Sequence, residues 1–278
     1  MTRRTALVAT TGAALLPALK GFEPGKAGRL KQSVARWCYK DMSLDDLARN
    51  GAEMGLSGID LVDQADWPTV RKYGLVPAMT ATGAGTIPDG WNRKESHPRL
   101  VEQMQGSIER AAAAKVPNVI TFSGNRKGLP DDQGMENCII GLKQVKKMAE
   151  DAGVTICLEL LNSKVNHKDY QCDHTAWGVA VMKGVDSPRV KLLYDIYHMQ
   201  IMEGDIIRTV RENIQYIAHF HTGGVPGRHE LDDTQELQWR TVATAIADLN
   251  FQGFFAHEFI PTKDPMTSLR QAVELCSV

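Results

Sequence analysis

The sequence lacks paired cysteines, glycine-rich phosphate loops and an excess of charge of one sign. No Cys-x-x-Cys occurs among its five widely spaced cysteines, which argues against a disulfide framework or a zinc knuckle. Cys157 lies inside an apolar run and is expected to be a small buried side chain. The net charge of −1 comes from interspersed acids and bases. This argues against a nucleic acid or a membrane surface as a partner recognised by charge.

A long apolar run is also lacking. The stretch ALVATTGAALLPAL near the N-terminus is too short for a confident membrane span, so none is expected in the mature protein. Arg3 and Arg4 precede this stretch, an arrangement that resembles a twin-arginine export signal, although Ala6 stands where a bulky residue is expected. We predict that residues 1–25 form such a signal or a flexible N-terminal arm. Export to the periplasm is favoured, with a cytoplasmic location as the alternative.

From residue 30 to residue 278, strand patterns alternate with helix patterns. The expected strands are 32–39, 55–63, 75–82, 116–125, 154–162, 190–199, 217–224 and 254–261. The expected helices are 43–55, 66–74, 98–115, 131–153, 173–185, 205–214, 237–249 and 266–276. Ser43 is expected to cap the start of the first helix, and Gly153 the end of the fourth.

Eight strand–helix repeats without a flexible linker predict an α/β fold, a single-domain (β/α)8 TIM barrel over residues 30–278. The chain of 278 residues is long enough, since such a barrel needs about 250 residues. An open doubly wound sheet is the alternative. It is less favoured because no GxGxxG or P-loop follows any expected strand.

Four successive expected strands each end in a side chain that binds metal ions, namely Glu159, Asp195, His221 and Glu258. A buried carboxylate is costly unless it is paired, so four such residues suggest one shared cation. Their separations of 36, 26 and 37 residues each match about one strand–helix unit, which would bring them together at the C-terminal mouth of a barrel. The set lacks thiolate and therefore favours Mn²⁺ or Mg²⁺, with Zn²⁺ and Co²⁺ as alternatives.

Such a site leaves open positions for two substrate oxygens. A cation that bridges a carbonyl and the adjacent hydroxyl acidifies the C–H between them and favours an enediolate. Glu159 and Glu258 come from different strands, so one can remove a proton while the other returns it. His219 should point the same way as His221, one layer deeper, whereas His257 should point toward the helices.

Several segments of the sequence carry a family resemblance. They are DGWNRKESH (89–97), LELLNS (158–163), YDIYHMQIMEGD (194–205), HFHTGGVPGRHE (219–230) and HEFIP (257–261). They resemble hydroxypyruvate isomerase and its xylose isomerase-like barrel relatives, from about residue 30 to the end. The resemblance implies that the four strand-end residues hold the metal, with the two glutamates as the acid/base pair. It also implies that His198 and Arg228 contact substrate oxygens.

Other residues are expected near the substrate. Asn162 is a further candidate contact, and Trp37 either lines the pocket or is buried in the barrel bottom. Arg228, in VPGRHE, could bind a carboxylate through two hydrogen bonds or form a surface salt bridge. His198 follows Asp195 by three residues and either binds substrate or caps a helix.

The predicted function is a metal-dependent aldose–ketose isomerase that converts hydroxypyruvate to tartronate semialdehyde through an enediolate. His221 departs from the pattern, because glutamine is usual there in bacterial hydroxypyruvate isomerases and histidine in ketose epimerases. The alternatives are a ketose 3-epimerase, a 3-keto-sugar eliminase or hydratase, or a non-catalytic barrel that binds a metal-chelated sugar acid. The partner is expected to be a small hydroxy-keto acid or sugar, and a homo-oligomer is left open.

Overall fold

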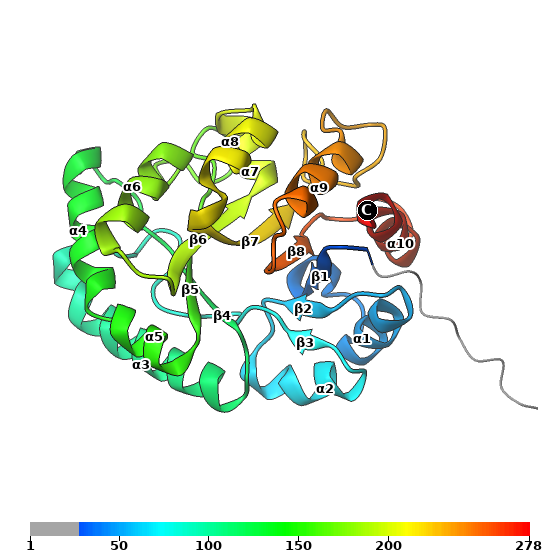
Figure 1. Ribbon diagram of the computed structural model, residues 1–278, viewed down its shortest axis with the longest axis horizontal. Helices are drawn as coiled ribbons and strands as arrows, with labels where there is room; N and C mark the ends of the chain where they lie inside the picture. Colours follow the sequence, from blue (N-terminus) through cyan, green and yellow to red (C-terminus); the bar gives the residue numbers. More distant parts are fainter. Residues whose placement is uncertain (1–27) are drawn as a thin grey trace, which may run out of the picture.

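A computed structural model describes residues 28–278, and the segment 1–25 discussed above lies outside this range. Within residues 28–278, eight parallel strands form one curled sheet that is surrounded by helices (Figure 1). The strands are β1 (Lys31–Ala35), β2 (Gly58–Asp60), β3 (Val76–Pro77), β4 (Asn118–Thr121), β5 (Thr155–Glu159), β6 (Val190–Asp195), β7 (Ile217–Thr222) and β8 (Phe254–His257).

The sheet follows the order β3-β2-β1-β8-β7-β6-β5-β4, so the first strand pairs with the last. β1 and β8 are in register from Lys31 opposite Phe254 to Val34 opposite His257. The two edge strands approach each other beyond β3, where the amide of Thr80 donates a hydrogen bond to Asn118 O at 3.2 Å. The prediction of a single-domain (β/α)8 barrel is confirmed.

Ten α-helices lie in the described part of the chain. They are α1 (Leu44–Glu53), α2 (Trp67–Lys72), α3 (His97–Ala113), α4 (Asp131–Lys143), α5 (Lys146–Ala152), α6 (Thr175–Val185), α7 (Ile196–Met202), α8 (Ile206–Asn213), α9 (Trp239–Asp248) and α10 (Pro265–Cys276). Ser43 caps α1 by accepting a hydrogen bond from Asp46 N at 3.0 Å, and Gly153 ends α5 with φ +67°, both as predicted.

Several expected elements were wrong in their extent. The helix expected over 131–153 is split into α4 and α5, because the amides of Gln144 and Val145 bond to carbonyls three residues back and tighten the turn. The strand expected over 190–199 ends at Asp195, whose side chain caps the start of α7. The other expected strands are shorter than predicted as well, since their last residues leave the ladder and enter the loops.

The inside of the barrel contains a small apolar cluster below the mouth. It consists of Met79, Ile120, Cys157 and Leu193, all buried. Cys157 and Leu193 precede Glu159 and Asp195 by two residues on β5 and β6 respectively, so each pair shares one face of its strand. Burial of Cys157 is thereby confirmed, and the strand-end carboxylates stand directly above this cluster.

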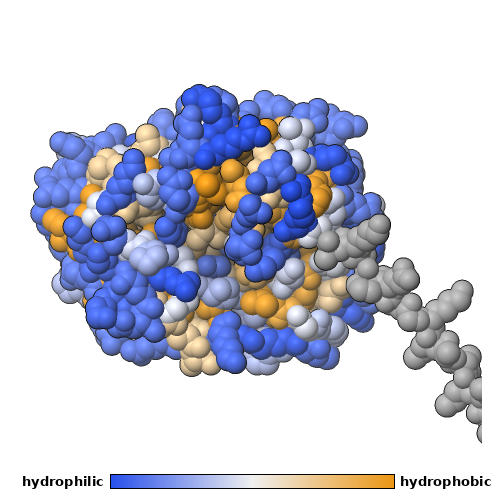
Figure 2. Space-filling model, viewed as in Figure 1, coloured by the Kyte–Doolittle hydropathy of each residue, from blue (hydrophilic) through white to orange (hydrophobic). Residues whose placement is uncertain are grey.

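A larger apolar layer lies between the sheet and the helices, whose outer faces are polar. Trp91, Trp239 and Phe255 are among the fully buried side chains of this layer. Hydrophilic residues cover much of the rim in Figure 2. Among the residues that the structure describes, no helix has the length and apolarity needed to cross a membrane.

Candidate metal and substrate site

The four residues predicted from the strand ends come together in the structure. Glu159 and Asp195 are the last residues of β5 and β6, His221 lies near the end of β7, and Glu258 directly follows β8. All four are buried, and one ligand atom from each lies within 4.8 Å of the others. We call Glu159, Asp195, His221 and Glu258 the ligand cluster.

His221 stands between the two glutamates. Its Nδ1 atom is 2.7 Å from Glu258 Oε2, 3.3 Å from Glu159 Oε1 and 3.9 Å from Asp195 Oδ2. Glu159 and Glu258 approach from two sides, because β5 and β8 are separated in the sheet by β6 and β7. The two carboxylates therefore flank one point.

Asp195 has two functions in the structure. Its Oδ1 atom accepts a hydrogen bond from the amide of His198 at 3.1 Å and so caps α7, while Oδ2 faces the ligand cluster. A carboxylate at a strand end could have been only a helix cap. Here the cap instead fixes the orientation of the second oxygen toward the cluster.

Arg228 is held over the cluster by a tightly bonded loop after β7. Its amide donates to Gly224 O at 2.8 Å, its carbonyl accepts from Ile260 N at 2.7 Å, and its φ of +60° is unusual for a residue with a side chain. The guanidinium binds Asp195 Oδ2 at 2.6 Å and also contacts Glu258. Arg228 is 9% exposed, so this is not a surface salt bridge.

His198 lies on α7 and is fixed from both sides. Its Nδ1 atom is 2.6 Å from Asn162 Nδ2, and its Nε2 atom is 2.7 Å from Arg228 Nη1. Asn162 Oδ1 accepts from the amides of Val165 and Asn166, which turns the Asn162 amide nitrogen toward His198. Asn162 is fully buried, so it reaches the site through His198.

Trp37 belongs to a 3-10 turn at Arg36–Tyr39 rather than to the end of a strand. Its indole Nε1–H donates to Glu258 Oε1 at 2.6 Å, and the side chain also lines a cavity of about 580 Å³ with Met42, Ile260 and Pro265. Trp37 is 42% exposed, so the expectation that it is buried in the barrel bottom is wrong. The cavity thus adjoins the ligand cluster through Trp37.

The two glutamates differ in proton affinity. Burial raises the pKa of Glu159 to about 7, although His221 beside it acts in the opposite direction. Burial also acts to raise the pKa of Glu258, but the positive charges of Arg228 and His221 outweigh it and hold that pKa well below its usual range. Two neighbouring carboxyls with such different environments are typical of acid/base pairs.

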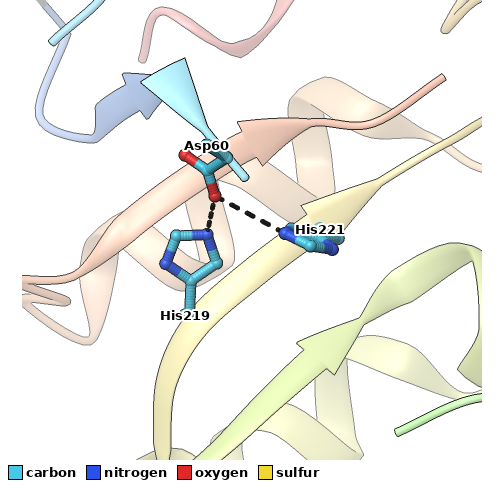
Figure 3. A group of neighbouring side chains, drawn as sticks. All are labelled: Asp60, His219 and His221. Atoms are coloured by element: carbon cyan, nitrogen blue, oxygen red, sulfur yellow. Dashed lines mark ion pairs between the residues drawn. The ribbon is translucent and has the colours of Figure 1, made fainter. Parts of the chain in front are cut away.

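Asp60, the last residue of β2, also belongs to the site but was not predicted from the sequence. Its Oδ2 atom contacts His219 Nε2 and lies 3.5 Å from His221 Nε2, and all three side chains are fully buried (Figure 3). The signal was present, because Asp60 is a carboxylate within the apolar run GLSGIDLVD. We call Asp60, His219 and His221 the Asp60 triad.

The two remaining histidines of interest lie as their strand positions predict. His219 shares the inner face of β7 with His221, one layer deeper. His257 faces away from the cluster and bonds through Nε2 to Gln32 Oε1 at 2.8 Å. Gln32 in turn donates to Val273 O on α10, so His257 belongs to the packing between sheet and helix.

The donor set of the ligand cluster fits a divalent cation. It offers carboxylate oxygens and one imidazole nitrogen, which are ligands of Mn²⁺, Mg²⁺ and Zn²⁺. Both nitrogens of His221 lack a hydrogen-bond partner of good geometry although they are buried. Fold and site together define a (β/α)8 barrel with a cluster of residues at its C-terminal mouth that could hold a metal ion.

Residues 52–277 match the xylose isomerase-like TIM barrel family, and the chain belongs to this family. It is 30% identical over 257 residues to a putative hydroxypyruvate isomerase from Homo sapiens, covering 84% of this chain and 90% of that protein. It is 34% identical over 122 residues to a D-psicose 3-epimerase from Ruminiclostridium cellulolyticum, covering 42% of this chain and 39% of that protein. The match to a putative hydroxypyruvate isomerase from Danio rerio, at 28% identity, also spans less than half of that relative, 46% of each chain.

Solved structures agree in fold. A family 2 AP endonuclease from Brucella melitensis superposes with a TM-score of 0.74 at 21% identity, covering 86% of this chain and 97% of that one. A 3-keto-D-glucoside 4-epimerase from E. coli gives a TM-score of 0.72 at 18% identity, covering 89% and 98%. At these identities the likeness establishes the barrel fold alone.

Proposed function

We propose that this protein is a metal-dependent isomerase of the hydroxypyruvate isomerase type. One observation carries the proposal: Glu159 and Glu258 flank His221 and Asp195 at a single buried point. Relatives named hydroxypyruvate isomerase, 2-oxo-tetronate isomerase and D-psicose 3-epimerase support the broader class of sugar isomerases and epimerases. The reaction would convert hydroxypyruvate to tartronate semialdehyde.

The ligand cluster would hold one divalent ion, Mn²⁺ or Mg²⁺ in preference to Zn²⁺ or Co²⁺. When bound, the ion supplies positive charge that favours loss of a proton from the carbon beside a carbonyl. Because Glu159 and Glu258 stand on two sides of the cluster, one carboxylate can take the proton from one carbon and the other can deliver a proton to the next. Atoms balance, since the substrate and its isomer have the same composition.

Arg228 and His198 would contact the substrate, and Trp37 would shield it from water. Arg228 offers a guanidinium beside Asp195 and Glu258, and His198 stands next to it at 2.7 Å. The guanidinium suits a carboxylate or a pair of substrate oxygens, and its Nη1–H also donates to His198 Nε2. Trp37 separates the cluster from the adjoining cavity and holds Glu258 by its indole N–H, so it would limit the entry of water.

A ketose 3-epimerase is the second candidate, with the 3-keto-sugar eliminase or hydratase as a variant of the same chemistry. His221 favours the epimerase, because ketose epimerases resemble this chain at that position, and the D-psicose 3-epimerase relative supports it. Epimerisation needs a proton donor and acceptor on opposite faces of one carbon. The flanking glutamates satisfy this requirement as well as they satisfy isomerisation.

The test is a substrate screen with the Mn²⁺-loaded protein in D₂O. Hydroxypyruvate, D-psicose and a 3-keto-glucoside are incubated separately, and deuterium at the substrate carbon is followed by NMR. Deuterium in hydroxypyruvate and its isomer supports the isomerase, and deuterium at C3 of psicose supports the epimerase. Binding of a sugar acid without deuterium uptake would indicate the non-catalytic barrel instead.

A further inference from the structure

Asp60 connects the inner part of the barrel to the ligand cluster. It lies at the end of β2, whereas both histidines of the Asp60 triad lie on β7, with β1 and β8 between these strands in the sheet. The carboxylate therefore reaches across the barrel interior to a single place on β7, where Oδ2 faces both imidazoles (Figure 3). All three side chains have no exposed surface, so water does not compete for these contacts.

The two nitrogens of His221 face different partners. Nδ1 faces Glu258 and Glu159 at 2.7 and 3.3 Å, and Nε2 faces Asp60 at 3.5 Å. A neutral imidazole carries one proton and has one free lone pair. A metal ligand needs that lone pair on the nitrogen that faces the ion, so the proton must sit on the opposite nitrogen. In His221 the opposite nitrogen is the one that faces Asp60.

We propose that Asp60 is a positioning residue for the metal centre. In the metal-loaded protein its Oδ2, which lies 3.5 Å from His221 Nε2, would accept the Nε2–H of His221 and so direct the Nδ1 lone pair toward the ligand cluster. His219 contacts the same oxygen through Nε2 and so restricts the rotation of the carboxylate. Carboxylates behind a metal-bound histidine commonly set the ring orientation and strengthen the ligand. The inference rests on the proposed metal-dependent function.

A second metal ion within the Asp60 triad is the competing interpretation. Its three donor atoms are close enough to be considered as ligands. However, Asp60 Oδ2 and His219 Nε2 are in direct contact as an ion pair. Two ligands of one ion each lie about 2.0–2.2 Å from it, so the ion must fit between them. The contact leaves no such space, and direct pairing of Asp60 with the two histidines is favoured.

The first experiment compares Zn²⁺ binding by wild type and Asp60→Asn, measured by calorimetry on the full chain. Asparagine keeps the shape but replaces one acceptor oxygen with an NH₂ group, so the dissociation constant should rise about 10- to 100-fold. Asp173→Asn is the matched control, because Asp173 is also a buried carboxylate but binds Arg126 and Ser163. The control should bind Zn²⁺ as wild type does, with one ion per chain.

The second experiment determines which nitrogen of His221 binds the metal and which carries the proton. In the Zn²⁺-loaded wild type, ¹H–¹⁵N NMR of the histidine side chains should show His221 bound through Nδ1, with a slowly exchanging Nε2–H; His221→Gln assigns the signal. Asp60→Asn should shift that proton upfield and speed its exchange. If the variant does not fold, the wild-type spectrum alone still shows which nitrogen of His221 binds the ion.

The outcomes separate the two proposals. Wild type that binds no divalent ion overturns the metal-dependent function and this inference with it. Wild type that binds one ion, with equal affinity in Asp60→Asn or with His221 bound through Nε2, overturns only the role of Asp60. Two ions per chain in wild type and one in Asp60→Asn would mean that the Asp60 triad is itself a metal site.

Discussion

The indole N–H of Trp37 donates a 2.6 Å hydrogen bond to Glu258 Oε1, joining the turn after β1 to the residue after β8. The other oxygen of Glu258 contacts His221 at 2.7 Å and also meets Arg228. Each oxygen of this carboxylate therefore has a charged or polar partner. Such a carboxylate is held in one orientation, which the proposed role of Glu258 as a base requires.

Glu258→Gln should lower turnover by roughly 10² to 10⁴, the usual contribution of a positioned acid or base. The amide keeps the shape and one ligand oxygen, so the affinity for Mn²⁺ should fall less than in Asp195→Ala. Steady-state kinetics and calorimetry on both variants check this. Near wild-type turnover in Glu258→Gln would mean that another group performs the proton transfer, and the isomerase proposal would be abandoned.

Arg228→Ala should raise KM more than it lowers kcat, because a guanidinium that binds substrate oxygens equally before and during reaction contributes uniform binding. Arg228→Lys keeps the charge but not the planar guanidinium group. Its KM should lie between those of wild type and Arg228→Ala. Initial rates over a range of substrate concentrations separate the two parameters. A lower kcat at unchanged KM would instead mean that Arg228 stabilises the transition state more than the bound substrate.

Removal of divalent metal by a chelator should abolish turnover and lower the melting temperature. Mn²⁺ at about 1,000 times its dissociation constant adds roughly 4 kcal/mol to the unfolding free energy, which raises Tm on the order of 10 °C. His221→Ala should lose this rise. Asp45→Asn, which removes an exposed carboxylate bound by Lys72, should retain it. An equal rise in His221→Ala would place the metal elsewhere.

The pKa of Glu159 predicts the pH dependence of stability of the chelator-treated protein. The carboxyl binds its proton more tightly when folded, with a pKa of about 7 against 4.5 in the unfolded chain. The folded state therefore loses stability as pH rises from 4.5 to 7. Glu159→Gln lacks this titration. As pH rises from 4.5 to 7, its unfolding free energy should therefore increase relative to that of wild type, by up to roughly 3 kcal/mol. Parallel urea-denaturation profiles from pH 4.5 to 8 would contradict the prediction.

A chain that begins at residue 26 should melt at nearly the same temperature as the full chain, because the strand–helix repeat starts near residue 30. The truncated chain keeps the hydrogen bond from Arg29 N to Val278 O and the ion pair between Arg29 and Asp248. Differential scanning calorimetry of the two chains is the measurement. A fall of many degrees would show that residues 1–25 contribute to the stability of the barrel.

The barrel and the ligand cluster could be predicted because their signals are local. A strand–helix period is read from apolar spacing, and polar residues at the ends of successive parallel strands must meet at one edge of the sheet. No further information was needed to predict that four residues meet there, namely Glu159, Asp195, His221 and Glu258. The end of β6 was misplaced, since helix capping by Asp195 depends on a side-chain orientation that apolar spacing does not encode.

Contacts between strands far apart in the sequence were decided only by the tertiary structure. Asp60 meets His219 and His221 because closure of the barrel places the inner faces of β2 and β7 against each other, which no pattern within either strand reveals. Trp37 reaches Glu258 because β1 pairs with β8. The sequence by itself determined which residue types end each strand. Closure of the sheet decided which of them contact one another, since these interactions act only over a few ångströms.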